Sequence, residues 1–420
     1  MKKNLLLHQI ALVLFLLNFV AVNAQSKHAP ASKFMTYKGL ALAGYQGWFD
    51  TENDGAGRGW NHYKHDNEFR PGKCNIDFWP DMTEYKVKYK TPFTNPDGKP
   101  AYIFSSYDKS TTELHFKWMQ DYGIDGVFMQ RFVQTIKSPL GLKNSVFILK
   151  NALEAAEKTD RAICIMYDLS GMKAVDVDLV IEDWKSLVDD YKLTKSKNNH
   201  YLYHRNKPLV AIWGVGFGDG RVYGYPEYDK LMRFFKNDPE YGGCSVLLGV
   251  PTSWRELTND SDSDPRLHQI IKRADIVQPW FVGRFNEKSY PKYHSLIEKD
   301  LLWCKENGLD YVPVLYPGFS WHNMKDGPLE QIPRNGGKFY WDQISKSIAL
   351  GCDMLYYAMF DEMDEGTAIF KVTDTPPVGE STFVTLHGLP SDHYLWLAGQ
   401  GTKMLRKEIP FSAELPVRVK

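Results

Sequence analysis

The stretch GVFMQRF at residues 126–132 is a short run rich in apolar and aromatic residues, and RAICIMY at residues 161–167 is another. Between these runs, Val146, Leu149 and Leu153 recur at the spacing that places side chains on one face of a helix. Two strand-like runs joined by one helical segment predict a β-α-β unit with parallel strands.

The same alternation continues along the chain in both directions. Eight strand-like runs occur at residues 40–45, 126–132, 161–167, 208–213, 245–250, 275–280, 311–316 and 353–360. Eight strand-helix repeats predict an α/β fold, a single (β/α)8 TIM barrel with extended βα loops, whose active site gathers at the carboxyl ends of the strands. A ninth run, residues 102–105, is assigned to a long first loop at residues 50–109. The alternative is a doubly wound open sheet.

Several helix ends are marked by particular residues. Ser110 and Glu113 have the spacing of a capping box, which would start a helix that ends at Gly123. Gly308 and Gly351 each follow an apolar stripe, where a glycine suits the left-handed residue that ends a helix. These positions predict helices before three of the expected strands.

The amino terminus has the pattern of a secretory signal peptide. Lys2 and Lys3 precede an apolar run, and Val22-Asn23-Ala24 resembles a cleavage site. We therefore expect residues 1–24 to be removed and residues 25–420 to form one catalytic domain that is secreted or periplasmic, with no membrane span. Residues from 375 onward are expected to pack on the barrel as a short C-terminal extension.

The charge and cysteine content exclude several classes of protein. The chain has 51 basic and 51 acidic residues, which is not the basic balance of a nucleic-acid-binding protein. Its five cysteines lie far apart and do not predict a disulfide framework or a zinc site. Cys164, Cys244 and Cys352 lie in or beside strand-like runs and are interpreted as core residues. No cofactor and no metal is predicted.

An acidic stretch, DEMDEG at residues 361–366, follows the last predicted strand. Four carboxylates packed this densely repel one another, so at least one should hold its proton to unusually high pH if the group is partly buried. The simple alternative is a solvated acidic loop. Its place at a strand's carboxyl end favours a catalytic site, and glycoside hydrolysis generally requires two carboxyl groups.

Aromatic and polar residues gather in the predicted rim loops. Flat rings can pack on the C–H face of a sugar while polar side chains bind its hydroxyls, although several of these rings could simply fill the barrel mouth. The candidate substrate contacts are Tyr45, Gln46, Trp48, His62, Gln130, Arg131, Asp168, Trp280, Arg284, Tyr316, Trp321, His322, Asn323 and Asp361.

Five motifs occur in order along the chain: GYQGWF at 44–49, DGVFMQRF at 125–132, YDLSGM at 167–172, YPGFSWHN at 316–323 and AMFDEMDEGTA at 358–368. Together they resemble glycoside hydrolase family 99, the endo-α-1,2-mannosidases and mannanases. The resemblance covers nearly the whole mature chain. It implies that the two catalytic carboxylates are Glu362 and Glu365, and that Tyr45 and the 316–323 loop lie in regions that line sugar subsites.

The resemblance also implies a mechanism. Glu362 would take the proton from O2 of the sugar and Glu365 would protonate the leaving oxygen, giving a 1,2-anhydro sugar that water opens with retention of configuration. In an α-mannoside, O2 and the leaving group are axial on opposite faces, so an in-line displacement is possible. The implied substrate is an α-1,2-mannan, or a glucosyl- or mannosyl-α-1,3-mannose-α-1,2-mannose. The alternatives are a catalytically silent glycan-binding protein and a hydrolase of a different α-glycan.

Overall fold

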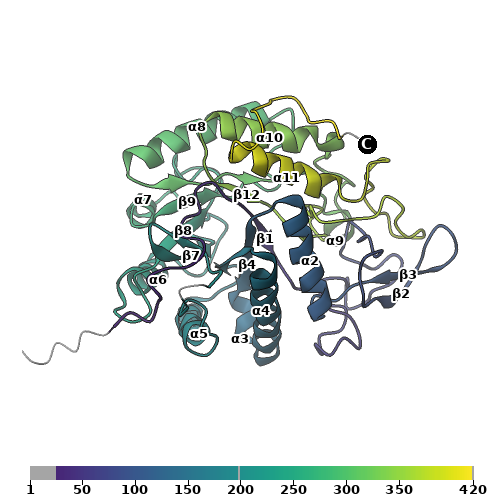
Figure 1. Cartoon of the computed structure of the whole chain (residues 1–420), viewed down its shortest axis with the longest axis horizontal. Coiled ribbons are helices and arrows are strands. Elements are labelled where there is room, and N and C mark those ends of the chain that lie inside the picture. The colour runs from purple at the N-terminus through teal and green to yellow at the C-terminus, as the bar shows by residue number, and fades with distance from the viewer. Residues whose placement is uncertain (1–24, 197–198, 419–420) are drawn as a thin grey trace, which may run out of the picture.

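The computed structural model describes residues 25–196 and 199–418 (Figure 1). The predicted signal peptide lies outside the described residues. One sheet runs through the centre of the molecule, and each named neighbour pair along it is parallel. Its strands are β1 (Ala41–Tyr45), β4 (Gly126–Phe132), β5 (Ala162–Asp168), β7 (Lys207–Trp213), β8 (Ser245–Val250), β9 (Ile276–Pro279), β10 (Asp310–Tyr311), β11 (Val314–Leu315) and β12 (Leu355–Tyr357).

The sheet closes through residues 310–315, which carry both β10 and β11. β10 pairs with β9 and β11 pairs with β12, so one segment joins the two ends of the strand order. Pro313 interrupts this segment because proline has no N–H to give to a ladder, and its carbonyl accepts from the backbone N–H of Tyr356 at 3.2 Å. The predicted (β/α)8 barrel is therefore confirmed, and the open sheet is wrong.

The barrel strands are buried on both faces. Every residue of β5 and of β8 is buried, because one face lies in the barrel interior and the other packs under helices. This explains why their sequences are continuous apolar runs without a polar alternation. The observed strands agree with the eight predicted runs to within a few residues at each end.

Helices surround the barrel and cover the outer faces of its strands (Figure 1). The longer ones are α2 (Lys109–Tyr122), α4 (Pro139–Thr159), α5 (Val177–Asp189), α6 (Tyr225–Asn237), α8 (Tyr290–Glu306), α10 (Lys338–Ala349) and α11 (His393–Leu405). The shorter ones are α3 (Val133–Lys137), α7 (Arg266–Ile271), α9 (His322–Lys325) and the 3-10 turns η1 (Ala174–Asp176) and η2 (Asn335–Gly337).

The predicted helix ends are mostly correct. Gly123 ends α2 with φ 82°, and Gly308 and Gly351 have φ 69° and 89°, in the left-handed region that glycine adopts at low cost. The predicted capping box is wrong: Asp108 is the N-cap of α2, so Ser110 and Glu113 already lie inside the helix.

Two segments outside the repeats lie where they were expected. The ninth apolar run overlaps β3 (Pro100–Ile103), which pairs only with β2 (Tyr89–Thr94) in a hairpin beside the barrel (Figure 1). A second antiparallel pairing joins the short strand β6 (Tyr203–His204) to the barrel strand β7. The C-terminal extension packs on the barrel through α11, where the Ala398 carbonyl accepts from the Tyr357 hydroxyl at 2.9 Å.

The five cysteines are buried and unpaired, and Cys164, Cys244 and Cys352 are core residues as expected. Within residues 25–196 and 199–418, no helix is long and apolar enough to cross a membrane. The same described residues contain no group of three or more histidine, cysteine or acidic side chains placed to hold a metal ion.

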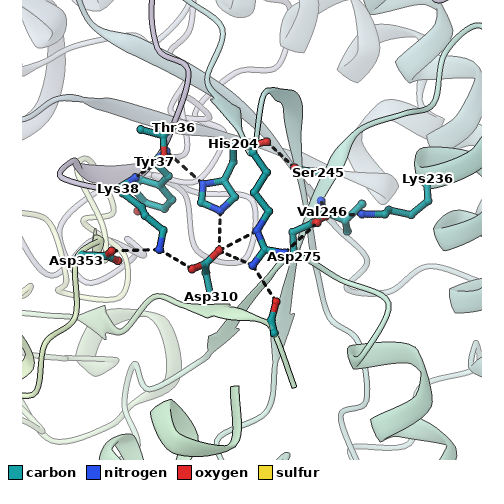
Figure 2. A network of polar contacts seen from close by, with 12 residues as sticks. Thr36, Tyr37, Lys38, His204, Lys236, Ser245, Val246, Asp275, Asp310 and Asp353 are labelled. Carbon is teal, nitrogen blue, oxygen red and sulfur yellow. Dashed lines mark hydrogen bonds and ion pairs between the residues drawn. The ribbon is translucent and has the colours of Figure 1, made fainter. Parts of the chain in front are cut away.

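A network of polar and charged side chains lies at the end of the barrel where the strands begin (Figure 2). At its centre, Asp310 lies 3.0 Å from His204, 2.6 Å from Arg205 and 2.8 Å from Lys38. Asp310 is the first residue of β10, His204 belongs to β6 and Lys38 precedes β1, so one carboxylate joins segments that are far apart in sequence. Contacts at this end of a barrel serve stability, because the active sites of these folds lie at the opposite end.

We expect Asp310→Ala to lower the free energy of unfolding by about 2–3 kcal/mol, because it leaves Nε2 of the buried His204 without its partner and removes the carboxylate from Arg205, which keeps the Gly308 carbonyl as an acceptor. Burial raises the pKa of Asp310, but hydrogen bonds from His204, Lys38 and Arg205 outweigh it and hold this pKa well below the ordinary 3.8. The contribution is therefore present above the ordinary pKa and lost as pH falls below it. Urea unfolding at neutral and acid pH measures both effects. The control is Asp353→Ala, an exposed partner of Lys38, which should change little.

Candidate active site

The acidic stretch forms a tight turn at the carboxyl end of β12. The Glu362 carbonyl accepts from the backbone N–H groups of Thr367 at 3.2 Å and Ala368 at 2.9 Å, which folds the segment back on itself. Phe360 N–H donates to the Gly44 carbonyl at 2.8 Å and anchors the turn to β1. The four carboxylates therefore lie at the barrel mouth beside the loop that follows β1, and they are not a solvated loop.

The β1 loop holds the first two acidic side chains. The backbone N–H groups of Gln46 and Gly47 each donate to one oxygen of Asp361 at 2.8 Å. The Gln46 side-chain amide donates to Glu362 Oε1 at 2.9 Å. Asp361 is fully buried with both oxygens occupied, so its predicted contact with substrate is wrong and its role is to fix the loop.

Glu362 is the deeper of the two candidate catalytic carboxyls. It is 4% exposed, and Thr367 Oγ1 lies 3.3 Å from its Oε2. Burial raises the pKa of Glu362 well above its usual value, and the charges of Glu365, Asp364 and Asp361 raise it further. The Gln46 amide opposes this rise, because its N–H stabilises the ionised form.

Glu365 is half-buried and faces different neighbours. Burial raises the pKa of its carboxyl, and the charges of Asp364 and Asp168 add to the rise. The Trp321 side chain and the Lys325 ammonium group oppose it. The charge of Glu365 adds to the rise in the pKa of Glu362, so ionising one of these two carboxyls makes it harder to ionise the other.

Asp168 brings a further carboxylate to the mouth from the end of β5. It is mostly buried, and Ser170 N–H donates to its Oδ1 at 2.7 Å. Burial raises the pKa of Asp168 to about 6. Its charge raises the pKa of Glu365, and β4 and β1 lie between β5 and β12 in the strand order.

Aromatic rings line the same opening. Trp280 lies edge-on to Trp213 at 5.5 Å and contacts the ring of Tyr356 at 6.4 Å. Gln130, from β4, donates to the Tyr356 hydroxyl at 3.0 Å. The predicted contacts Gln130 and Trp280 are thus half-buried around the barrel interior, where the ends of β4, β9 and β12 converge.

A second ring surface lies in the β1 loop. The His62 and Trp48 rings stack at 3.7 Å with an interplanar angle of 7°. His62 Nδ1 lies 3.1 Å from Asp364 Oδ2, where its N–H donates to the carboxylate. Both rings are half-buried, and they bring the predicted contacts Trp48 and His62 to the edge of the carboxylate cluster.

Three predicted contacts point away from the mouth, which corrects the sequence-based assignment. Tyr45 is fully buried and its hydroxyl lies 2.9 Å from His115 of α2. Arg131 is buried and pairs with Asp183 of α5. Successive residues of a strand face opposite sides, so these two residues at the outer face of β1 and β4 pack under helices while their neighbours face inward.

Tyr316 is the third of these residues. It is fully buried, and its hydroxyl donates to the Phe285 carbonyl behind the loop. Arg284, in the same region, is exposed, with its guanidinium 3.6 Å from the carboxylate of Asp260. Neither side chain contributes to the carboxylate cluster in this structure.

The predicted contacts in the 316–323 loop divide into two kinds. Trp321 is half-buried, and its side chain lowers the pKa of the Glu365 carboxyl. The backbone N–H groups of His322 and Asn323 instead donate to Asp77 at 2.8 Å, and the Asn323 amide donates to the Ile76 carbonyl at 3.0 Å. These two residues therefore position the loop, although both remain half-buried.

Two residues outside the predicted substrate contacts also shape the mouth. Arg334 Nη2 donates to the carbonyls of Gly366 at 2.9 Å and Ala368 at 2.6 Å, so a buried cation holds the far end of the acidic turn. Tyr356 lies inside β12 and reaches Gln130. The inward periodicity of β12 could have indicated Tyr356, whereas nothing in the sequence indicates the carbonyl partners of Arg334.

The chain has a barrel fold that also occurs in glycoside hydrolases. It is similar in structure to the glycoside hydrolase family 99 endo-α-mannosidase from Bacteroides thetaiotaomicron. The similarity covers 88% of this chain and 98% of that chain, with a TM-score of 0.66 and 15% sequence identity. The complex of that enzyme with bis-tris-propane gives a TM-score of 0.63 and 16% identity, with the same coverage of both chains.

A structure described as a glycoside hydrolase-like protein gives a TM-score of 0.51 at 12% identity, over 78% of this chain and 94% of that chain. No family model matches the sequence, and no curated protein does. At these identities the likeness shows a shared fold, namely the fold of the family 99 endo-α-mannosidase.

Proposed function

We propose that this protein is a retaining, endo-acting glycoside hydrolase that cleaves α-mannosidic linkages. The observation that supports it is the pair Glu362 and Glu365, two interacting carboxyls at the mouth of a barrel with the fold of an endo-α-mannosidase. Glycoside hydrolysis generally requires two carboxyl groups of the enzyme, one on each side of the scissile bond. No cofactor is part of the proposal.

In the first step, Glu362 takes the proton from O2 of the mannose, and O2 attacks C1. The bond from C1 to the leaving oxygen breaks, and Glu365 gives its proton to that oxygen. The Gln46 amide favours the ionised form of Glu362 that this step needs. The half-buried position of Glu365 suits a group that must reach the leaving sugar.

In the second step, Glu365 takes a proton from water, and the water oxygen attacks C1 of the 1,2-anhydro sugar. The bond from C1 to O2 breaks, and Glu362 returns its proton to O2. Two displacements at C1 leave its configuration as it was in the substrate. Both carboxyls are then back in their starting states.

The rings and polar groups around the pair suit a sugar chain. Trp48 and Trp280 offer half-buried aromatic faces to the C–H surfaces of pyranoses. The side chains of Asp168 and Gln130 can form hydrogen bonds with hydroxyl groups of the sugar. Aromatic surfaces in the loops after β1 and β9 support binding of a sugar chain on both sides of the cleaved bond, which favours endo action.

The decisive experiment is product analysis on a panel of glycans. We expect α-1,2-mannan, or glucosyl- or mannosyl-α-1,3-mannose-α-1,2-mannose, to release oligosaccharides whose new reducing end first appears in the α configuration by NMR. The matched control is the double variant Glu362→Gln/Glu365→Gln. Binding without products would instead support a glycan-binding protein, and products from a different α-glycan alone would change the substrate.

We also propose that the mature protein is secreted or periplasmic. The support is the sequence pattern of residues 1–24. Cell fractionation and sequencing of the mature amino terminus test this, with Gln25 expected as the first residue.

A further inference from the structure

Asp364 is a buried carboxylate that the proposed proton transfers do not use. It is 3% exposed, and it lies in the chain between Glu362 and Glu365. Its Oδ2 faces His62 Nδ1 at 3.1 Å, whereas its Oδ1 is buried without a hydrogen-bond partner among the described residues. A buried charge with one incomplete oxygen costs free energy, so its presence between two other acids requires a physical reason.

His62 is held rigidly against this carboxylate. Its backbone has φ 61°, in the left-handed region, and its ring stacks on Trp48 at 3.7 Å. The Asn61 side chain donates to the Trp48 carbonyl at 2.7 Å and braces the same turn. The stacking fixes the plane of the imidazole with Nδ1 directed at Asp364, so the carboxylate has one defined position relative to the pair.

Asp364 is placed to influence both members of the pair. Its negative charge raises the pKa of Glu362 and the pKa of Glu365. By comparison, both oxygens of Asp361 are already bound by backbone N–H groups. The other charged or titratable groups that face this cluster are Asp168 at the end of β5, Lys325 of α9, Tyr356 of β12 and Tyr63 of the β1 loop.

We propose that Asp364, buried in the same turn as Glu362 and Glu365 and fixed by His62, is a positioning residue whose charge opposes ionisation of both glutamates together, so that one of them keeps its proton. The proposal rests on the proposed function, because it assigns a purpose to that proton as the one delivered to the leaving oxygen. Asp364 needs no contact with the sugar for this role. Its effect is carried by the electric field that its charge creates at two nearby carboxyls.

The test is Asp364→Asn, which keeps the shape of the side chain and an oxygen for His62 but removes the charge. Without that charge both glutamates release protons more readily. In a plot of kcat/KM against pH, the acid limb and the alkaline limb should therefore both move to lower pH by roughly one unit. KM should stay close to the wild-type value. A lower kcat at every pH with unmoved limbs would indicate a merely structural role and overturn the proposal.

His62→Phe provides a second variant that retains a ring to stack on Trp48. It removes the hydrogen-bond donor that fixes Asp364, so the carboxylate loses its defined position, and both arms of the pH profile should move in the same direction as in Asp364→Asn. The double variant should add nothing to Asp364→Asn, because both changes act through one charge. If the two substitutions shifted the pH profile independently of each other, the proposal that His62 acts through Asp364 would be contradicted.

The control is Asp66→Asn, which removes an exposed aspartate of the same loop that pairs with Lys73 at 2.6 Å. It should leave the profile unchanged. NMR titration of the 13C-labelled glutamate carboxyls gives a readout that needs no turnover: Asp364→Asn should lower the pKa of both Glu362 and Glu365. If the wild-type chain cleaves no glycan, the proposed function fails, while this titration still decides the role of Asp364.

Discussion

Glu365→Gln is expected to lower kcat/KM on an α-mannan by roughly 10²–10⁴-fold, the usual contribution of one positioned acid or base. Glutamine keeps the shape of the side chain but has no proton to give to the leaving oxygen. Initial rates of oligosaccharide release measure the loss. Glu298→Gln, an exposed change on α8, is the matched control and should retain wild-type activity.

The leaving group separates an acid from a residue that only maintains the fold. A mannoside whose leaving group is a weak base needs little help from a proton, so Glu365→Gln should retain much more of its activity on such a substrate than on mannan. An equal loss on both substrates would contradict the acid role. If Glu365→Gln cleaved mannan as fast as the wild-type protein, Glu365 would not be the acid.

The fold was predictable because it depends on a repeated local pattern. Strands buried on both faces must be continuous apolar runs, and β5 and β8 show this without exception. The capping box at Ser110 failed for an equally local reason: the spacing fits, but the backbone enters the helix already at Asp108. Such end positions depend on geometry that a spacing of residue types does not specify.

The position of the acidic stretch was predictable, but the direction of individual side chains was predictable only in part. Gln130 and Arg131 are neighbours in β4, yet one faces the mouth and the other pairs with Asp183 under α5. Alternation along a strand gives two opposite faces, and the tyrosine, glutamine and arginine types alone do not say which face is inward. Tyr45 was misassigned for the same reason.

The contacts that hold the acidic turn could not be predicted, because they join residues that are far apart in sequence. The backbone of Gln46 and Gly47 binds Asp361 across more than three hundred residues. Asp77 binds the backbone of His322 and Asn323 across a similar separation. A single sequence contains no signal for such pairs, and only the closed barrel brings the β1 loop beside the end of β12.

Glu362→Gln is expected to lower kcat/KM on mannan by a similar factor, roughly 10²–10⁴-fold, but with a different dependence on substrate. The base removes a proton from O2, and a better leaving group does not replace that step. The loss should therefore be as large on an activated mannoside as on mannan, unlike the loss in Glu365→Gln. Paired measurements on the two substrates give this comparison directly.

A substrate without O2 tests the same step from the other side. The wild-type protein should not cleave a 2-deoxy analogue of the mannoside, because nothing on that sugar can attack C1. Cleavage of the analogue at the normal rate would contradict base catalysis through O2 and would require Glu362 to attack the sugar directly.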